Sequence, residues 1–148
     1  MVLLAGIIVA LSIGIVVAGV PYIPHPPGTI AAAETHDVPS QPSNSTTPGT
    51  YPVRLSNLPG GSQFAIGVTV TNGVASFCVE REAYYLSWSL NSQFAQGGLA
   101  FQYDNCIVMP KDLAQTTLRF TTTVTDNWDV VAINDSPSPI TVEFSPAA

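Results

Sequence analysis

The chain has 148 residues, of which 46% are hydrophobic and only 9% are charged. Four basic and ten acidic side chains give a net charge of −6. This balance argues against a nucleic-acid partner, because phosphate binding needs clustered Lys and Arg. Globular domains carry about 25% charged residues, so uncharged polar side chains must cover most of this surface.

Residues 1–20, MVLLAGIIVALSIGIVVAGV, carry no charged side chain. Twenty helical residues span about 30 Å, which is the thickness of a bilayer core. The segment therefore predicts a hydrophobic helix that anchors the chain in a membrane or packs in the core of an assembly. A cleaved signal peptide is the alternative, although no basic residue precedes the apolar run.

Four small side chains recur every fourth residue of this segment. A stripe of small residues on a helix lets two backbones approach closely within a membrane. The spacing predicts a helix-packing contact between copies of the chain, although Gly and Ala are common in any membrane span. The residues of the stripe are Gly6, Ala10, Gly14 and Ala18.

Residues 21–50 hold seven prolines interleaved with Ser and Thr. Proline removes backbone donors and blocks helix continuation, and a segment of this composition cannot bury a core. The sequence predicts an extended linker, with a short turn of helix at 29–36. His25 and His36 lie in this linker and are expected to be solvated, so neither predicts a metal site.

Residues 51–148 show short runs of alternating apolar and polar side chains, the pattern of half-buried strands. Asn72-Gly73 between two of these runs favours a type I′ β-hairpin. The predicted fold class is an N-terminal hydrophobic α-helix followed by an all-β antiparallel sandwich of immunoglobulin-like or jelly-roll type. The predicted strands are 51–57, 64–70, 75–81, 83–90, 97–105, 117–127, 128–134 and 140–144.

The two cysteines, Cys78 and Cys106, have no CxxC spacing that would indicate a metal site. Behind a membrane-targeting segment, a disulfide between them is the favoured interpretation. Two unpaired buried thiols are the alternative. A disulfide would place the domain outside the cytoplasm, in an extracellular location at the cell surface.

Carboxylates are the only side chains that suggest chemistry. Glu80 and Glu82 could share one face of a strand and act as an acid–base pair, but an exposed strand end is the simpler interpretation. Oxygen-rich loops around Asp126, Asp129 and Asp135 could hold Ca²⁺. No nucleophile, base and oxyanion donor are grouped together, so we predict a protein that is not an enzyme and needs no cofactor or metal.

Two N-x-S/T patterns, at Asn44 and Asn134, predict glycosylation sites in an extracellular chain. The first lies in the predicted linker. Ser and Thr around it could also carry O-linked sugars.

The charge-free segment 1–20, followed by a Ser/Thr/Pro-rich linker and a small β domain, resembles a mature archaeal type IV pilin. The resemblance implies that hydrophobic helices form a filament core and that β domains, often glycosylated, coat the outside. The implied partners are copies of the chain itself, the membrane before assembly, and glycans. The implied role is adhesion or surface attachment.

Two alternatives remain open at this stage. One is a single-pass, membrane-anchored extracellular binding module that uses loops of the sandwich. The other is a filament built by strand exchange, with residues 51–57 as the donor strand.

Overall fold

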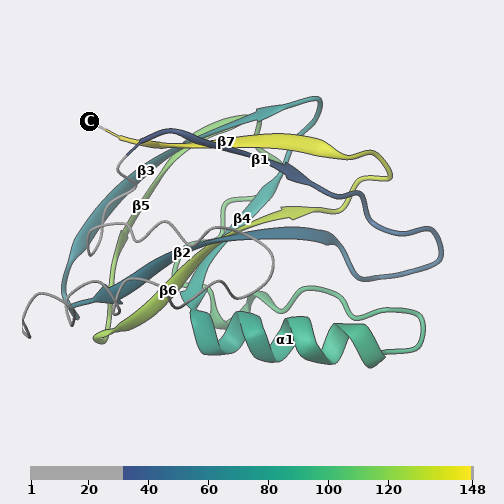
Figure 1. The fold of residues 1–148 in the computed structure, drawn as a ribbon, viewed down its shortest axis with the longest axis horizontal. Helices are drawn as coiled ribbons and strands as arrows, with labels where there is room; N and C mark the ends of the chain where they lie inside the picture. The colour runs from purple at the N-terminus through teal and green to yellow at the C-terminus, as the bar shows by residue number, and fades with distance from the viewer. Residues whose placement is uncertain (1–31, 148) are drawn as a thin grey trace, which may run out of the picture.

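Residues 32–147, which the computed structural model describes, form two packed antiparallel sheets with a helix on the outer face of one of them (Figure 1). The four-stranded sheet has the order β1-β7-β3-β5, and the three-stranded sheet has the order β2-β6-β4. The strands are β1 (Glu34–Val38), β2 (Gly49–Leu58), β3 (Gln63–Thr71), β4 (Ser76–Arg81), β5 (Gln115–Thr121), β6 (Asp126–Asn134) and β7 (Ile140–Pro146).

The main core lies between the two sheets. Alternate residues of β3 point inward, as the period of two requires, and Ile66 and Val68 are buried. Phe77 of β4 meets Phe144 of β7 edge to face, with ring centroids 6.4 Å apart. Trp128 on β6 is 1% exposed and is the largest side chain in this core.

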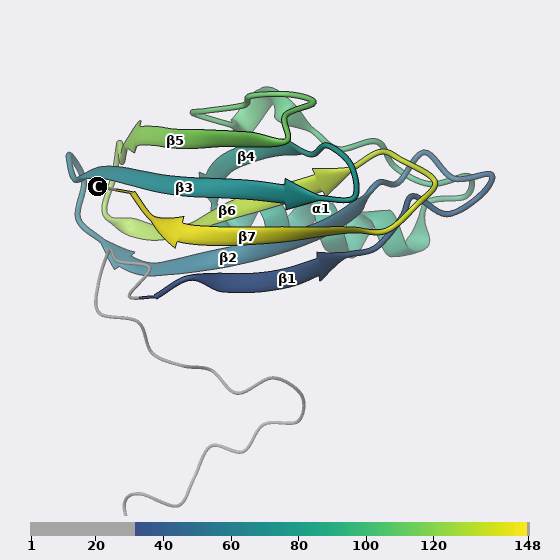
Figure 2. The same cartoon turned by 90° about the horizontal axis from the view of Figure 1, so that it is seen from above.

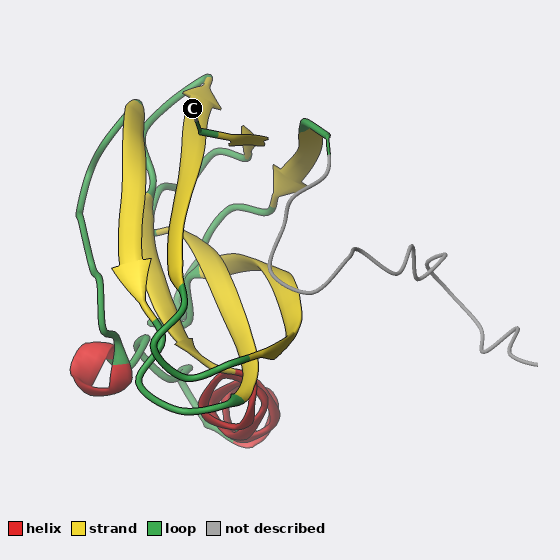
Figure 3. Cartoon of the chain, turned by 90° about the vertical axis from the view of Figure 1, so that its left-hand side faces the viewer, coloured by secondary structure: helices red, strands yellow, loops and turns green. Residues whose placement is uncertain are grey.

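The three-stranded sheet is buried on both faces. On β6, Val130 and Ala132 face the main core, whereas Val131 and Ile133 face a second apolar cluster. That second cluster lies under helix α1, Glu82–Phe94. Seen along the helix, the four-stranded sheet, the three-stranded sheet and α1 form three layers (Figure 3).

Helix α1 occupies the segment that we predicted as the strand 83–90. Its buried side chains, Tyr85 and Trp88, are three residues apart, which is helical spacing. The indole Nε1 of Trp88 donates a hydrogen bond to the Ala100 carbonyl at 3.0 Å. The helix contains no Gly or Pro, and Glu82 in its first turn favours the positive end of the helix dipole.

The predicted fold class is therefore wrong. The domain predicted to be all-β contains α1, which forms because the outer face of the three-stranded sheet needs an apolar cover. Within residues 32–147, no helix is long and apolar enough to cross a membrane. The predicted helix at 1–20 lies outside the described residues.

The predicted β-hairpin at Asn72-Gly73 is also wrong. Strand β3 is hydrogen-bonded to β7 on one side and to β5 on the other, so it has no free edge for β4. The chain instead crosses from the four-stranded to the three-stranded sheet between β3 and β4 (Figure 2).

Four further segments differ from the prediction. Residues 34–38, predicted as linker or helical turn, form β1 and pair with β7, and β2 begins at Gly49. The segment predicted as the strand 97–105 is a loop that ends in the short 3₁₀ helix η1, Tyr103–Asn105. Strand β5 ends at Thr121, and the chain turns before β6.

Replacement of Trp88 by Ala tests the docking of α1. Loss of a buried Trp costs about 3–5 kcal/mol, so W88A should lower the free energy of unfolding by that amount in urea titrations. The control is L90A on the same helix, where Leu90 is 58% exposed and the change should stay within about 0.5 kcal/mol. Equal losses in both variants would contradict the helical placement.

Candidate functional site

Cys78 of β4 forms a disulfide with Cys106, as predicted. The bond ties the loop after α1 to the three-stranded sheet. Next to it, the Ile107 amide donates to the Val79 carbonyl at 2.8 Å, and the Val79 amide donates to the Val108 carbonyl at 3.0 Å. The disulfide and these hydrogen bonds hold residues 106–108 along the outer edge of β4.

Two buried carboxylates lie between the three-stranded sheet and α1. Glu80 of β4 and Asp129 of β6 are cross-strand partners, which places their Cβ atoms about 5 Å apart. Glu80 is 2% exposed and Asp129 is 0% exposed. Among residues 32–147, Glu80 Oε1 and Asp129 Oδ2 find no hydrogen-bond partner.

One cation approaches this pair from β2. Arg54 Nε contacts Asp129 Oδ1 at 3.3 Å, and its Nη1 contacts Glu82 Oε1 at 2.8 Å. The other Glu82 oxygen, Oε2, accepts a hydrogen bond from Asn127 Nδ2 at 2.7 Å. Arg54 therefore links Asp129 to the first residue of α1, and Glu80 forms no ion pair with any residue of 32–147.

The electrostatics of the pair follow from this arrangement. Burial, and then repulsion by Asp129, raise the pKa of Glu80 to about 7. Burial raises the pKa of Asp129 to about 6, although Arg54 opposes the rise. The Tyr85 hydroxyl on α1, 3.0 Å from Thr50 Oγ1, also has a raised pKa because it is buried.

The pair lies sealed from solvent beneath the helix. Its raised pKa values mean that proton binding stabilises the folded domain, whereas ionisation of both carboxylates opposes folding. The interpretation of Glu80 and Glu82 as an exposed strand end is wrong: Glu80 is buried, and Glu82 begins α1. The burial of Glu80 and Asp129 could have been inferred from the flanking apolar runs, which signal burial on both faces, whereas their pairing depends on the register of β4 on β6.

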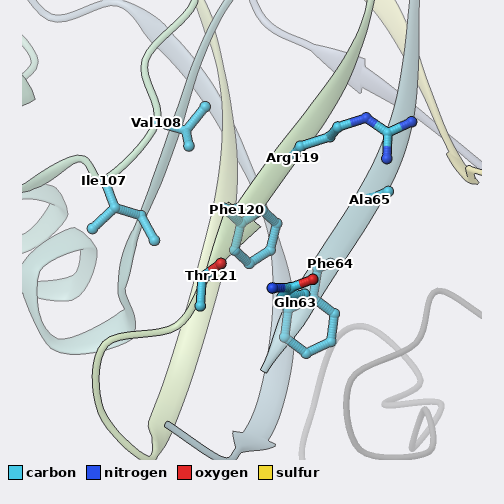
Figure 4. A pocket seen from close by; sticks show the side chains of 8 residues that line it. All are labelled: Gln63, Phe64, Ala65, Ile107, Val108, Arg119, Phe120 and Thr121. Atoms are coloured by element: carbon cyan, nitrogen blue, oxygen red, sulfur yellow. The ribbon is translucent and has the colours of Figure 1, made fainter. Parts of the chain in front are cut away.

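A groove of about 570 Å³ opens between β5 and residues 107–108. Phe64 and Phe120 stack on its floor, with ring centroids 5.3 Å apart. Ile107 and Val108 lie across from Phe120, and the Arg119 side chain extends from β5 toward Ala65 on β3 (Figure 4). The groove thus combines an aromatic floor with polar side chains, Gln63, Arg119 and Thr121.

The outer face of α1 exposes an apolar stripe. Leu86, Leu90 and Phe94 follow one another at four-residue spacing and are 49%, 58% and 78% exposed. The sequence pattern was taken for a strand, so this helical stripe was missed.

The two predicted glycosylation sites have different environments. Asn44 is exposed and has a φ of 64°, in a turn of the loop between β1 and β2. Asn134 is 0% exposed, and its Nδ2 donates to the carbonyls of Pro39 at 3.0 Å and Ser138 at 2.9 Å. The folded domain leaves no room for a sugar on Asn134, whereas glycosylation of Asn44 remains a prediction.

The other candidate residues are dispersed. The predicted helix-packing residues Gly6, Ala10, Gly14 and Ala18 lie outside the described residues. Asp126 pairs with Arg81, whose Nε donates to Asp126 Oδ2 at 2.6 Å. Within residues 32–147, no three His, Cys, Asp or Glu side chains are grouped so that they could hold a metal ion.

No protein-family model matches this chain, and no curated protein matches its sequence.

Removal of the disulfide tests its contribution to stability. Cys78 and Cys106 are 28 residues apart, and closure of a loop of that length contributes about 3–4 kcal/mol on the chain-entropy model. The double variant C78S/C106S should lose that stability in denaturant titrations. Addition of a reducing agent should lower the unfolding midpoint of the wild type and leave that of the double variant unchanged. An unchanged unfolding midpoint in the double variant would contradict this role.

The carboxylate pair predicts a pH-dependent stability. Both folded pKa values exceed the unfolded values of about 4, so the folded state binds more protons than the unfolded state between about pH 4 and pH 7. Stability should therefore fall as pH rises through this window.

The variant E80Q removes the titration and keeps the shape of the side chain. It should flatten the pH dependence of the unfolding midpoint and stabilise the domain at pH 8. D104N, at an exposed position of η1, is the control and should keep the wild-type profile. A wild-type profile in E80Q would contradict the role of this pair.

Proposed function

We propose that the protein is a structural subunit of a cell-surface filament that serves adhesion or surface attachment. In this proposal the apolar segment 1–20 inserts in the membrane before assembly and lies inside the assembled filament. The sandwich faces outward and carries sugars at exposed positions such as Asn44. The partners are copies of the same chain.

The observation that carries the proposal is a disulfide-bonded domain preceded by a charge-free segment of twenty residues. Disulfides persist in oxidising compartments such as the cell surface. An apolar segment of this length needs a lipid or protein environment, and an assembly of many copies provides one. Strand β1 lies at the edge of its sheet, so the residues before it join the domain at that edge.

The exposed apolar stripe on α1 gives independent support for contacts with other molecules. Contiguous exposed apolar side chains with polar surroundings mark interaction surfaces. Leu86, Leu90 and Phe94 form such a surface on the outer layer of the domain.

A second function is favoured by the groove beside β5. A membrane-anchored binding module would use the groove floor at Phe64 and Phe120, with the polar side chains around it, to hold a ligand or peptide. Such a module would act as a monomer and would need no contact between copies.

Electron microscopy of material sheared from cells, with N-terminal sequencing of the same sample, separates the two functions. We expect filaments whose subunits begin with MVLLAGIIVA, because the apolar segment is retained inside the assembly. Cells from which the coding sequence has been deleted should yield none. Protein recovered only in detergent, and only as a monomer, would contradict the filament and favour the anchored module.

A further inference from the structure

The four sheet edges differ in the features that discourage strand addition. Edge strand β1 is five residues long, and its acidic side chains, Glu34 and Asp37, disfavour pairing with a second copy of β1 but not with a strand that carries a cation. Strand β2 contains Pro52 and a register shift between Leu55 and Leu58. The outer edge of β4 is covered by residues 107–113, which are hydrogen-bonded to it.

The fourth edge, β5, has no such protection. Its seven residues, QTTLRFT, include no proline and a single charge, Arg119. Within residues 32–147, β5 pairs with β3 alone, and Arg119 forms no ion pair. In Figure 2, β5 forms one margin of the four-stranded sheet and β1 forms the other.

Hydrogen bonds at the ends of the strands show which backbone groups of β5 face this open edge. The Val70 amide donates to the Ala114 carbonyl at 2.7 Å, so the even-numbered groups of β3 face β5. The backbone amides and carbonyls of successive residues point to opposite edges of a strand. Those of Leu118 on β5 therefore face β3. The amides and carbonyls of Arg119 and Thr121 therefore face outward.

The same reasoning applies to β1 at the opposite margin. The Ala147 amide donates to the Ala65 carbonyl at 3.4 Å, so the odd-numbered groups of β3 face β7. The even-numbered backbone groups of β7 therefore face β1. His36 lies opposite Val142, so its amide and carbonyl face β7. The backbone groups of Thr35 and Asp37 face outward, and their side chains lie on the exposed face of the sheet.

We propose that β5 of one copy pairs with β1 of the next copy, with Arg119 opposite Asp37. Both residues have outward-facing backbone groups and exposed side chains, so one register satisfies the hydrogen bonds and joins opposite charges. Three successive antiparallel pairings make β1 and β5 antiparallel within one copy. A second copy in the same orientation, placed beside β5 of the first copy, therefore presents its β1 antiparallel to that β5.

This contact is head to tail. Heterologous contacts of this kind generate open filaments when the rotation between copies does not close a ring. The inference rests on the proposed filament and identifies its subunit contact. It also replaces residues 51–57 as the exchanged strand, because they lie in β2 and pair with β6 of their own chain.

Proline variants of the full chain test the contact. Proline is tolerated in an edge strand where its missing amide would face away from the sheet. We expect T121P on β5 and T35P on β1 to lower the yield of sheared filaments at least tenfold while the thermal unfolding of each domain is preserved.

Charge variants test the register. R119D and D37R should each weaken assembly, and the double variant R119D/D37R should restore it. K111D, which has the same charge change in the loop before β5, is the matched control and should assemble like the wild type. In assembled T35C/T121C, the two positions face each other at about 5.5 Å between Cα atoms, so oxidation should produce covalent ladders.

The outcomes separate the contact from the function. If the wild type forms filaments and T35P and T121P form them equally well, the β1–β5 contact is overturned and the filament function stands. If the wild type forms no filaments and T35C/T121C gives no ladder, both proposals fail. If filaments form without a ladder and without charge rescue, the contact is overturned in favour of the apolar stripe on α1.

Discussion

Burial of the three-stranded sheet on both faces is the constraint on which the rest of this structure depends. Four consecutive apolar residues on β6, 130–133, cannot all face one core, because neighbouring side chains point to opposite sides. One face is covered by the other sheet and one by α1. Removal of the helix would expose Val131, Ile133 and Cys78 to water.

The carboxylate pair and the disulfide both belong to this second interface. Glu80 and Asp129 lie on the same face of the sheet as Cys78 and Val131. Helix α1 therefore buries the two acidic side chains together with the apolar ones. Burying a charge is costly unless it is paired, and the raised pKa values show that protonation relieves part of this cost. Arg54 offsets another part by pairing with Asp129 and Glu82. The folded domain is therefore more stable at acidic pH, where the pair is protonated, than at neutral pH.

The sequence predicted the strands whose pattern reflects packing against one layer. It failed for the segment whose structure depends on covering a second face of a sheet. The strands near 64–70, 75–81 and 140–144 have clear alternation or apolar runs, and they were found. The run 83–90 alternates like a strand, yet Tyr85 and Trp88 are the residues that fill the space over β6. The segment contains no Gly or Pro, which is compatible with a helix. The unbroken apolar run on β6 indicates that a third layer covers that strand.

Other errors arose from tertiary pairing that local sequence does not report. Asn72-Gly73 favours a hairpin only if the preceding strand has a free edge, and β3 has none. The disulfide followed from cysteine count and context, but the partner of Glu80 required the register of β4 on β6. Asn134 matches a glycosylation pattern, yet its buried amide links Pro39, which follows β1, to Ser138, which precedes β7.

The distribution of protected and open edges links the fold to assembly. A monomeric sandwich gains nothing from one long open edge, which is a hazard for uncontrolled pairing. An open edge with a single cation, and an acidic edge at the opposite margin of the same sheet, instead favour pairing in one direction between unlike edges. Two copies of β5 paired through Arg119 would bring like charges together, and so would two copies of β1 through Asp37. Charge therefore selects the head-to-tail contact over either symmetric dimer, which is the selection that a growing filament requires.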